Sequence, residues 1–272
     1  MSLQSAAEVR RRYAGKAKAE WERLQATPIT RIEYMITSHC LERYLPDRGR
    51  ILDAGSGPGR YAIDLARRGY QVMMFDLVRE MLQLGRVRCA QTGVGDRVPT
   101  PVEGDICALP YAGGAFDAVI SLGAPLSHLT EAHARSRAVE EMVRVVKAGG
   151  PVFLTCIARL AAYRGAIYWP GWHFFDQLLT AEARATGISR GSQIWYCFAT
   201  GELEGLARQA GLQIVDRIGC EGLASYLPMR RLAQIEADPM RGPVWREILL
   251  QTCNDPTIIG MSNHLLVIAR KE

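Results

Sequence analysis

Short apolar runs alternate with helical stretches from about residue 50 to residue 157, and this rhythm constrains the fold more than any other feature of the chain. The apolar runs read RILDAG, QVMMFD, VPTPV, FDAVISLG and PVFLTCIA, with helices expected at 61–67, 78–92 and 131–146. Strands separated by crossover helices pair in parallel, and a parallel sheet needs helices on both faces. Because such crossovers are right-handed, the pattern predicts a doubly wound, Rossmann-like α/β sheet. Pro99 and Pro101 cannot donate to a ladder, so the VPTPV strand is expected at an edge.

The rest of the chain divides around this core. Helices are expected at 5–24 and 30–44, so residues 1–48 are interpreted as an N-terminal helical cap and residues 49–272 as the main domain. From 159 to 198 the alternation stops in a stretch rich in aromatic residues. A connection of this length inside a compact domain usually carries function or helices of its own. Beyond it, LQIVDRIG and HLLVIAR are expected as further strands.

Composition fits a single large domain. The 272 residues include 48% hydrophobic and 22% charged residues, which is ordinary for a protein with a substantial core. Seven cysteines without CxxC spacing argue against a disulfide framework or a zinc site, so no metal is expected. No apolar run would span a bilayer and no signal peptide is visible, which predicts a cytoplasmic protein without membrane contact. The sequence leaves open whether the protein is a monomer or a homodimer.

The net charge of +5 is concentrated near the start of the sequence. A solvated helix face is the simpler interpretation, and contact with RNA or an acidic substrate is the alternative. The basic residues concerned are Arg10, Arg11, Arg12, Lys16, Lys18, Arg23, Arg31 and Arg43.

A glycine-rich loop, DAGSGPGR, joins the first expected strand to the first crossover helix. Glycines allow a tight turn and let a ligand approach the backbone closely, and the helix that follows offers free amide groups. The dinucleotide fingerprint places a small residue where Arg60 stands here. Two further acids strengthen the prediction of a nucleoside site: Asp76 ends the second strand, where a carboxylate can hold ribose hydroxyls, and Asp105 can accept from an adenine amino group.

In these segments the sequence resembles the class I S-adenosylmethionine-dependent methyltransferases. The resemblance rests on LDAGSGPGRYA, VMMFDLVREML, EGDICALPY, FDAVISLG and VRVVKAGGPVFLT, which occur in order and at suitable spacing. It implies a seven-stranded, mostly parallel sheet of order 3-2-1-4-5-7-6 whose last strand is antiparallel. It also implies S-adenosylmethionine as cofactor and S-adenosylhomocysteine as its product.

Carried over to the matching positions, the resemblance implies a complete cofactor site. The glycines would line the methionine moiety, Asp53 would orient their loop and help hold the amino group, and Asp76 would chelate the ribose. Asp105 and Ile106 would flank the adenine. The residues assigned to the cofactor in this way are Asp53, Gly55, Gly57, Gly59, Asp76, Leu77, Met81, Asp105, Ile106 and Leu122.

The segment LGAPLSHLT follows the fourth strand at its carboxyl end, where ligands bind in open α/β sheets. It is similar to the GPLYHL stretch of a bacterial subgroup of small methyltransferases, with Ser127 in place of the aromatic residue. His128 is therefore a candidate to act as a base or to orient the acceptor, and a structural histidine is the alternative.

The same subgroup has an N-terminal pattern similar to YAGKAKAEWERL followed by RIEY. It implies that Tyr13, Trp21, Arg23 and Glu33 fold over the cofactor mouth, with Tyr13 a second catalytic candidate. Trp21 and Glu33 are assigned to the acceptor. For Tyr13 and Trp21, packing of a helix face is the alternative.

The aromatic stretch at 159–198 is predicted to be a lid on which a flat, apolar acceptor rests, although aromatic residues at such spacing are also typical of a core. Trp172 and Trp195 are assigned to the acceptor, with Trp169 and Phe174 as further candidates. His173 is a weaker alternative base.

The predicted function is methyl transfer from S-adenosylmethionine to an O, N or C nucleophile of a small molecule by in-line displacement. The donor is already activated, so the protein aligns the reactants and excludes water, and a base is needed only for an acceptor that is protonated. The alternatives are a tRNA methyltransferase acting on a modified wobble base, a cofactor-binding module without activity, and an NAD-dependent oxidoreductase. Arg60 and Asp105 disfavour the oxidoreductase.

Overall fold

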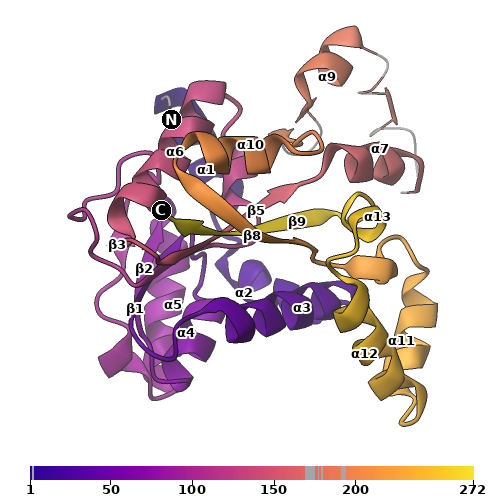
Figure 1. Ribbon diagram of the computed structural model, residues 1–272, viewed down its shortest axis with the longest axis horizontal. Helices are drawn as coiled ribbons and strands as arrows, with labels where there is room; N and C mark the ends of the chain where they lie inside the picture. The colour runs from indigo at the N-terminus through magenta and orange to yellow at the C-terminus, as the bar shows by residue number, and fades with distance from the viewer. Residues whose placement is uncertain (2, 169–174, 177, 179, 191–193) are drawn as a thin grey trace.

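A seven-stranded sheet forms the centre of the molecule (Figure 1). The computed structural model describes residues 1–272 except 2, 169–174, 177, 179 and 191–193. The strands are β1 Arg50–Ala54, β2 Gln71–Asp76, β3 Val102–Glu103, β4 Ala118–Ser121, β5 Pro151–Ile157, β8 Leu212–Gly219 and β9 His264–Lys271. They lie in the order β3-β2-β1-β4-β5-β9-β8, and β9 is antiparallel to both of its neighbours. The implied order 3-2-1-4-5-7-6 with an antiparallel last strand is therefore confirmed.

The weakest strand lies at the edge, as expected. β3 holds only two residues and pairs with β2 through Phe75↔Val102 and Asp76↔Glu103. Pro99 and Pro101 come just before it and stay outside the ladder, because neither has an N–H to donate.

Helices cover both faces of the sheet, and alternate residues of each strand enter different cores. On β1, Ile51 packs toward α3 Pro28–Tyr44, α4 Arg60–Arg67 and α5 Arg79–Gln91. Its neighbour Leu52 packs toward α6 Ala132–Val145 and α10 Glu202–Gln209, which lie across the sheet from α3 and α4 in Figure 1. The crossover helices expected from the sequence are therefore present on both sides of the sheet.

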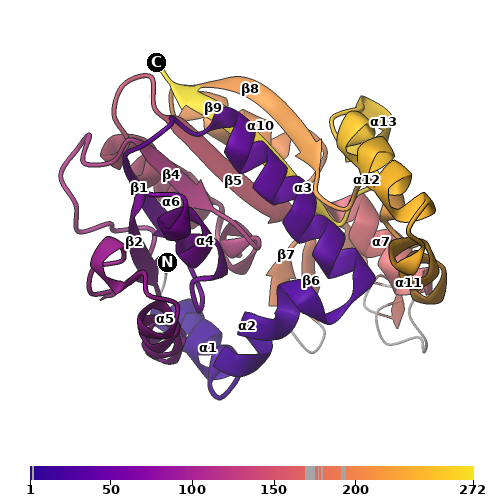
Figure 2. The ribbon, with the colours of Figure 1, turned by 90° about the horizontal axis from the view of Figure 1, so that it is seen from below.

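The N-terminal segment differs from the single helix expected at 5–24. Two helices form instead, α1 Leu3–Tyr13 and α2 Ala17–Ala26, because Gly15 adopts a φ of 71° that ends the first one. The Gly15 N–H donates to Glu80 Oε2 of α5 at 2.6 Å, which ties the bend to the main domain. Figure 2 shows α1 and α2 crossing the molecule beside α5.

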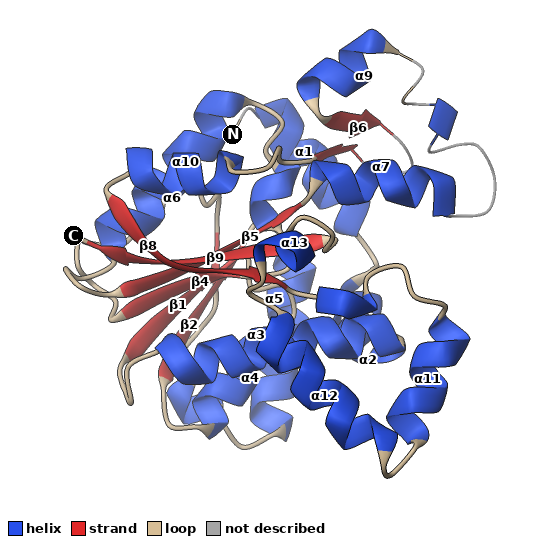
Figure 3. Cartoon of the chain, turned by 45° about the vertical axis from the view of Figure 1, so that its right-hand side comes forward, coloured by secondary structure: helices blue, strands red, loops and turns tan. Residues whose placement is uncertain are grey.

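Two segments add structure that the strand pattern does not predict. Between β5 and β8 lie α7 Arg159–Tyr168, α9 Ala181–Thr186, β6 Ile188–Arg190 and β7 Ile194–Tyr196, with β6 and β7 paired in a small sheet of their own (Figure 3). The two ends of this insertion meet where Ala158 bridges Phe198. Between β8 and β9 lie α11 Met229–Ala237, α12 Arg241–Thr252 and α13 Pro256–Ile259.

The described residues also include the short 3-10 turns η1 Gly95–Arg97, η2 Pro125–His128 and η3 Gly222–Ala224. All seven cysteines are unpaired and buried, where they act as small hydrophobic residues. Among the helices of the described residues, none combines the length and the apolar character needed to cross a bilayer.

Candidate active site

The glycine loop after β1 depends on left-handed backbone at all three glycines. Their φ values are 86° at Gly55, 52° at Gly57 and 80° at Gly59, a region that residues with a Cβ rarely adopt. A Cβ at Gly55 would lie 2.5 Å from Pro125 Cγ, and one at Gly59 would lie 2.6 Å from Met74 Cε. A Cβ at Gly57 would meet no atom within 4 Å, so the loop opens onto free space at this glycine.

Asp76 fastens this loop to the end of β2. Its Oδ2 accepts from the Gly57 N–H at 2.7 Å, and its Oδ1 accepts from the Val78 N–H at 2.8 Å. Burial raises the pKa of Asp76 to about 6, although these backbone hydrogen bonds oppose the shift. A carboxylate has about four lone-pair positions, so Asp76 can still accept from two hydroxyl groups of a ligand.

Asp53 lies behind the loop, and one of its carboxylate oxygens accepts no hydrogen bond from the described residues. The residue is buried, and its Oδ2 has no hydrogen-bond partner among the described residues. Burial and then the charge of Asp76 raise the pKa of Asp53 to about 8. An orphaned buried carboxylate oxygen beside a glycine loop is suited to a cationic donor such as an ammonium group.

A cavity of about 460 Å³ runs along the carboxyl ends of the parallel strands. Eleven of the predicted site residues line it: Tyr13, Gly55, Gly57, Asp76, Leu77, Met81, Asp105, Ile106, Leu122, His128 and Trp195. We call the part formed by Gly57, Asp76, Leu77 and Asp105 the β2 end, and the part formed by Ile157, His128, Trp195 and His264 the β9 end. Neighbouring strands are about 4.8 Å apart, so four strand positions separate β2 from β9 by roughly 19 Å.

At the β2 end, Asp105 follows the short edge strand and turns back toward the sheet. Its Oδ1 accepts from the Cys107 N–H at 2.9 Å, and its Oδ2 lies 3.3 Å from the amino nitrogen of Met1. Leu77 and Ile106 add apolar surface to the same wall of the cavity. This combination of two acids and apolar side chains is suited to a nucleoside.

His128 lies at the centre of a polar cluster that joins α1 to η2. Arg12 Nη1 donates to His128 Nδ1 at 3.1 Å, and the Tyr13 hydroxyl lies 2.9 Å from His128 Nε2. Because Nδ1 accepts from a guanidinium, the neutral ring carries its proton on Nε2 and donates it to the Tyr13 oxygen. Burial and then the charge of Arg12 lower the pKa of His128 to about 3. Both ring nitrogens are thus engaged, an arrangement that favours orientation of the acceptor over proton abstraction by His128.

Trp195 adds an aromatic wall beside this cluster. Its ring centroid lies 4.4 Å from that of His128, and the Arg12 guanidinium lies 5.3 Å from it. Trp195 stands on β7 and lines the cavity, so the insertion contributes to the site. Trp172, Trp169, His173 and Phe174 lie outside the described residues.

Four predicted site residues do not line the cavity: Asp53, Gly59, Trp21 and Glu33. Gly59 begins α4 and packs against Met74. The ring of Trp21 lies between two guanidinium groups, 4.0 Å from that of Arg60 and 5.1 Å from that of Arg88. Trp21 therefore fastens α2 to α4 and α5, and helix packing describes it better than contact with an acceptor.

The cavity wall also includes charged residues that were not assigned a chemical role from the sequence, namely Glu20, Arg23, Arg60 and His264. Glu20 and Arg23 lie on α2, where Arg23 Nε is 3.5 Å from Glu20 Oε2. Burial raises the pKa of Glu20. His264 is the first residue of β9, and because β9 is antiparallel its start meets the carboxyl ends of the parallel strands. The expected antiparallel direction of the last strand was the one feature of the sequence that could have placed His264 at the site.

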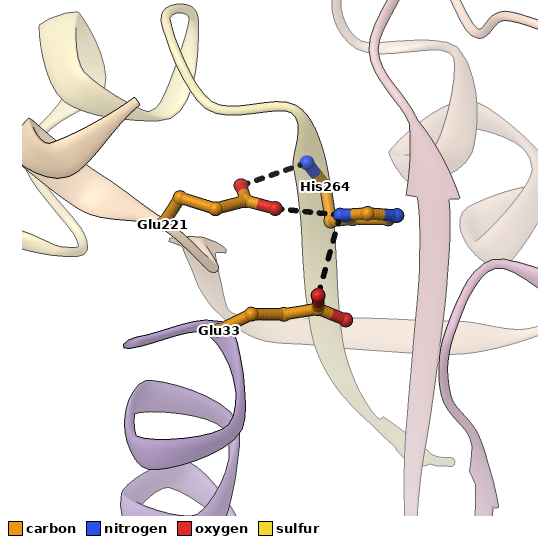
Figure 4. Close-up of side chains that lie close together, drawn as sticks. All are labelled: Glu33, Glu221 and His264. Carbon is orange, nitrogen blue, oxygen red and sulfur yellow. Dashed lines mark hydrogen bonds and ion pairs between the residues drawn. The ribbon is translucent and has the colours of Figure 1, made fainter. Parts of the chain in front are cut away.

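Glu33 connects two of these residues from beneath the cavity. It is buried on α3 and receives both of its carboxylate contacts from Arg23 Nη1, at 3.2 and 3.0 Å. Its Oε2 also lies 4.0 Å from His264 Nδ1. Figure 4 shows Glu33 and Glu221 approaching the same side of the His264 ring from two different elements. Glu33 therefore holds cavity residues in place and does not itself face the cavity.

Comparisons with known proteins agree with this geometry. Residues 51–150 match the methyltransferase domain family. The ubiquinone biosynthesis O-methyltransferase of Xanthomonas axonopodis pv. citri is 28% identical over 233 residues, which cover 83% of this chain and 87% of that protein. The matched domain holds the glycine loop, Asp76 and Asp105.

Solved structures share the fold at lower identity. A methyltransferase structure from Methanosarcina mazei superposes with a TM-score of 0.59 at 18% identity, covering 85% of this chain and 96% of that one. A [4+2]-cyclase also superposes, with a TM-score of 0.54 at 21% identity and coverages of 89% and 80%. The fold alone therefore does not decide the chemistry, which has to be argued from the site.

Proposed function

We propose that this chain, which is a class I S-adenosylmethionine-dependent methyltransferase, methylates a small-molecule acceptor bound at the β9 end of its cavity. The observation that carries the proposal is the cavity itself, because it joins a nucleoside-type end to an aromatic and cationic end within about 460 Å³. A space of this size admits the donor together with part of a compact acceptor. The relative named for an O-methyltransferase step of ubiquinone biosynthesis also supports a small acceptor.

The residues at the β2 end fit S-adenosylmethionine. Asp76 would hold the ribose hydroxyls, Asp105 and Ile106 would flank the adenine, and Gly57 would let the methionine portion approach the backbone. The unpartnered Oδ2 of Asp53 would meet the amino group, directly or through water. The bound donor supplies an activated methyl group on a sulfonium sulfur.

The residues at the β9 end would position the acceptor in line with that methyl group. His128 Nε2–H donates to the Tyr13 oxygen, so the hydroxyl proton of Tyr13 is free to donate toward the cavity. Burial raises the pKa of Tyr13, which keeps this proton in place. Trp195 would supply a flat surface for an aromatic or planar acceptor.

Two segments would enclose the reactants. Residues 1–48 bring Tyr13, Glu20 and Arg23 over the cavity and would act as a cap. The insertion at 159–198 brings Trp195 and would act as a lid. Exclusion of water strengthens the electrostatic interactions inside such a site.

The basic residues near the start of the chain support a small acceptor over tRNA. Arg12 is engaged with His128, Arg23 with Glu33, and Arg31 with Glu236 at 2.6 Å. Arg23 and Arg31 neutralise carboxylates within the chain, and Arg12 is held by a hydrogen bond to a neutral imidazole, so Arg23 and Arg31 have less charge left for phosphate contacts. The proposed location of the protein is the cytoplasm.

Calorimetry with S-adenosylmethionine, S-adenosylhomocysteine and NAD tests the donor. We expect micromolar binding of both sulfur compounds and no binding of NAD. Transfer of a radiolabelled methyl group to a panel of phenols, amines and carboxylic acids, with tRNA as a competing acceptor, tests the rest. Labelling of tRNA with a steep dependence on salt would favour the alternative, and absence of donor binding would refute the proposal.

A further inference from the structure

The polar group formed by His264, Glu221 and Glu33 lies at the β9 end, away from the residues proposed to bind the donor. Glu221 follows β8, Glu33 belongs to α3 and His264 begins β9. The two glutamates are buried, whereas the His264 side chain is 22% exposed and lines the cavity. Three separate elements thus place two carboxylates behind a single imidazole that faces the cavity.

The hydrogen bonds of this group define the orientation of the imidazole. His264 Nδ1 lies 2.6 Å from Glu221 Oε1, and the His264 backbone N–H donates to Glu221 Oε2 at 2.9 Å. Glu221 therefore holds both the backbone and the ring of His264. Since the carboxylate accepts from Nδ1–H, the basic lone pair of the neutral ring is on Nε2.

Nε2 points away from both glutamates in Figure 4. Within the described part of the chain it has no hydrogen-bond partner, unlike both ring nitrogens of His128. An oriented imidazole with a carboxylate on Nδ1 and a free Nε2 at a cavity wall is the arrangement of a histidine general base.

We infer that His264 takes the proton from the hydroxyl group of a phenolic or enolic acceptor, and that Glu221 is the positioning residue for its imidazole. This inference rests on the proposed function and narrows it to O-methylation. The O–H bond breaks as the proton passes to the Nε2 lone pair. The oxygen then uses its electron pair to bond the methyl carbon, while the pair of the broken S–C bond stays on sulfur.

The charges around His264 fit an acceptor of this acidity. Glu33 and Glu221 raise the pKa of His264 to about 9, although burial lowers it and the Arg23 guanidinium also opposes the shift. A phenol has a pKa of about 10, so proton transfer to this imidazole is nearly balanced.

The same three residues also have the donor atoms of a metal site, with one ligand atom from each within 4.8 Å of the others. Two contacts favour the general base. Nδ1 carries a proton toward Glu221 that a metal ion would first have to displace, and the charge of Glu33 is already balanced by Arg23 at 3.0 Å. The cluster is therefore electrically satisfied as it stands.

The first test measures the imidazole itself, without donor or acceptor. NMR titration of the ring nitrogens is expected to give His264 a pKa near 9. Above that pH, the neutral ring should be the Nδ1–H tautomer. The His264 signals are assigned by their loss in His264→Gln. Glu221→Gln should lower this pKa by about two units and move the proton to Nε2, because the amide can donate to Nδ1. Glu131→Gln is the matched control, since Glu131 pairs with His133 on the surface, 3.5 Å away.

The second test uses 4-nitrocatechol, a chromogenic phenol, added to the protein loaded with S-adenosylhomocysteine. We expect the wild type to bind it as the phenolate, and His264→Gln to raise the apparent pKa of the bound phenol by at least one unit. With the methyl donor present, kcat/KM should rise with pH up to about 9 and fall about 100-fold in His264→Gln. S-adenosylhomocysteine should bind this variant as tightly as the wild type, because His264 lies far from Asp76.

Each result has a defined meaning. Failure of the wild type to bind S-adenosylhomocysteine would refute the proposed function. Three results would refute only the inference, provided that S-adenosylhomocysteine binds normally. They are an ordinary pKa for His264, no binding of the phenol, or an apparent pKa of the bound phenol that is the same in His264→Gln and in the wild type. Stoichiometric binding of Zn²⁺ or Mg²⁺ that removes the Nδ1–H signal would also overturn it, by making the cluster a metal site.

Discussion

The two ends of the cavity are built in different ways from the same chain. The β2 end takes its polar groups from residues 53 to 105, each at or just after the end of a neighbouring parallel strand. The β9 end takes Tyr13 from α1, His128 from η2, Trp195 from the insertion and His264 from the antiparallel strand. Consecutive strand ends make one binding surface directly, whereas the other surface exists only after distant segments have packed. A change at the β2 end should therefore affect donor binding, and one at the β9 end should affect the acceptor.

Asp76→Ala is the strongest way to break the β2 end. It removes the acceptor of the Gly57 and Val78 N–H groups as well as the carboxylate proposed for the ribose. We expect affinity for S-adenosylhomocysteine to fall at least 100-fold, since hydrogen bonds to a charged group contribute about 1.5–3 kcal/mol each. Calorimetry measures the loss. Affinity within threefold of the wild type would show that the donor binds elsewhere.

Gly57→Ala is a smaller change at the same end. The substitution forces a Cβ into left-handed backbone and places a methyl group in the open space of the loop, so donor affinity should fall about tenfold. Gly201→Ala is the matched control, because Gly201 has a φ of 79° and equally open surroundings at the start of α10. Chemical denaturation should give each variant a loss of about 1 kcal/mol in unfolding free energy. Equal donor affinity in the two variants would contradict the assigned role of Gly57.

Tyr13→Phe tests the β9 end. It leaves His128 Nε2–H without its partner and removes the hydroxyl that faces the acceptor, so kcat/KM for the acceptor should fall about fivefold. Donor affinity should stay the same. Tyr70→Phe serves as control, because Tyr70 also uses its hydroxyl within the chain, donating to the Pro46 carbonyl at 2.7 Å, but does not line the cavity. A loss of donor affinity in Tyr13→Phe would place this residue at the β2 end.

The buried carboxyl behind the glycine loop should make the stability of the ligand-free protein depend on pH. The folded pKa of Asp53, about 8, lies above its ordinary value, so its contribution to stability is full at low pH and is lost as the pH rises through 8. We expect the free energy of unfolding to fall by about 2–3 kcal/mol between pH 6 and pH 9, and Asp53→Asn to lessen this fall. Urea denaturation at both pH values measures it. An unchanged pH dependence in the variant would show that Asp53 is ionised without penalty.

Much of the fold was predictable because its signals are local. The apolar runs of β1, β2, β4 and β5 are long enough to form buried strands, and Pro99 and Pro101 place their own strand at an edge wherever the sheet forms. The break at Gly15 was not predictable from the apolar stripe of α1 and α2, which continues across it. Gly15 bends the chain there with a positive φ, and the bend is held by a hydrogen bond to Glu80, 65 residues away in the sequence.

For the candidate site, the sequence determined which residues meet at the β2 end. A glycine loop, Asp76 and Asp105 each follow a parallel strand, and parallel strands always bring their carboxyl ends to one edge. Only the tertiary structure decided the rest: that Trp21 packs between Arg60 and Arg88, that Arg12 occupies His128 Nδ1, and that Glu33 and Glu221 converge on His264. The physical reason is that a charge or a proton position depends on neighbours within a few ångströms, and these neighbours come from elements that no sequence spacing relates.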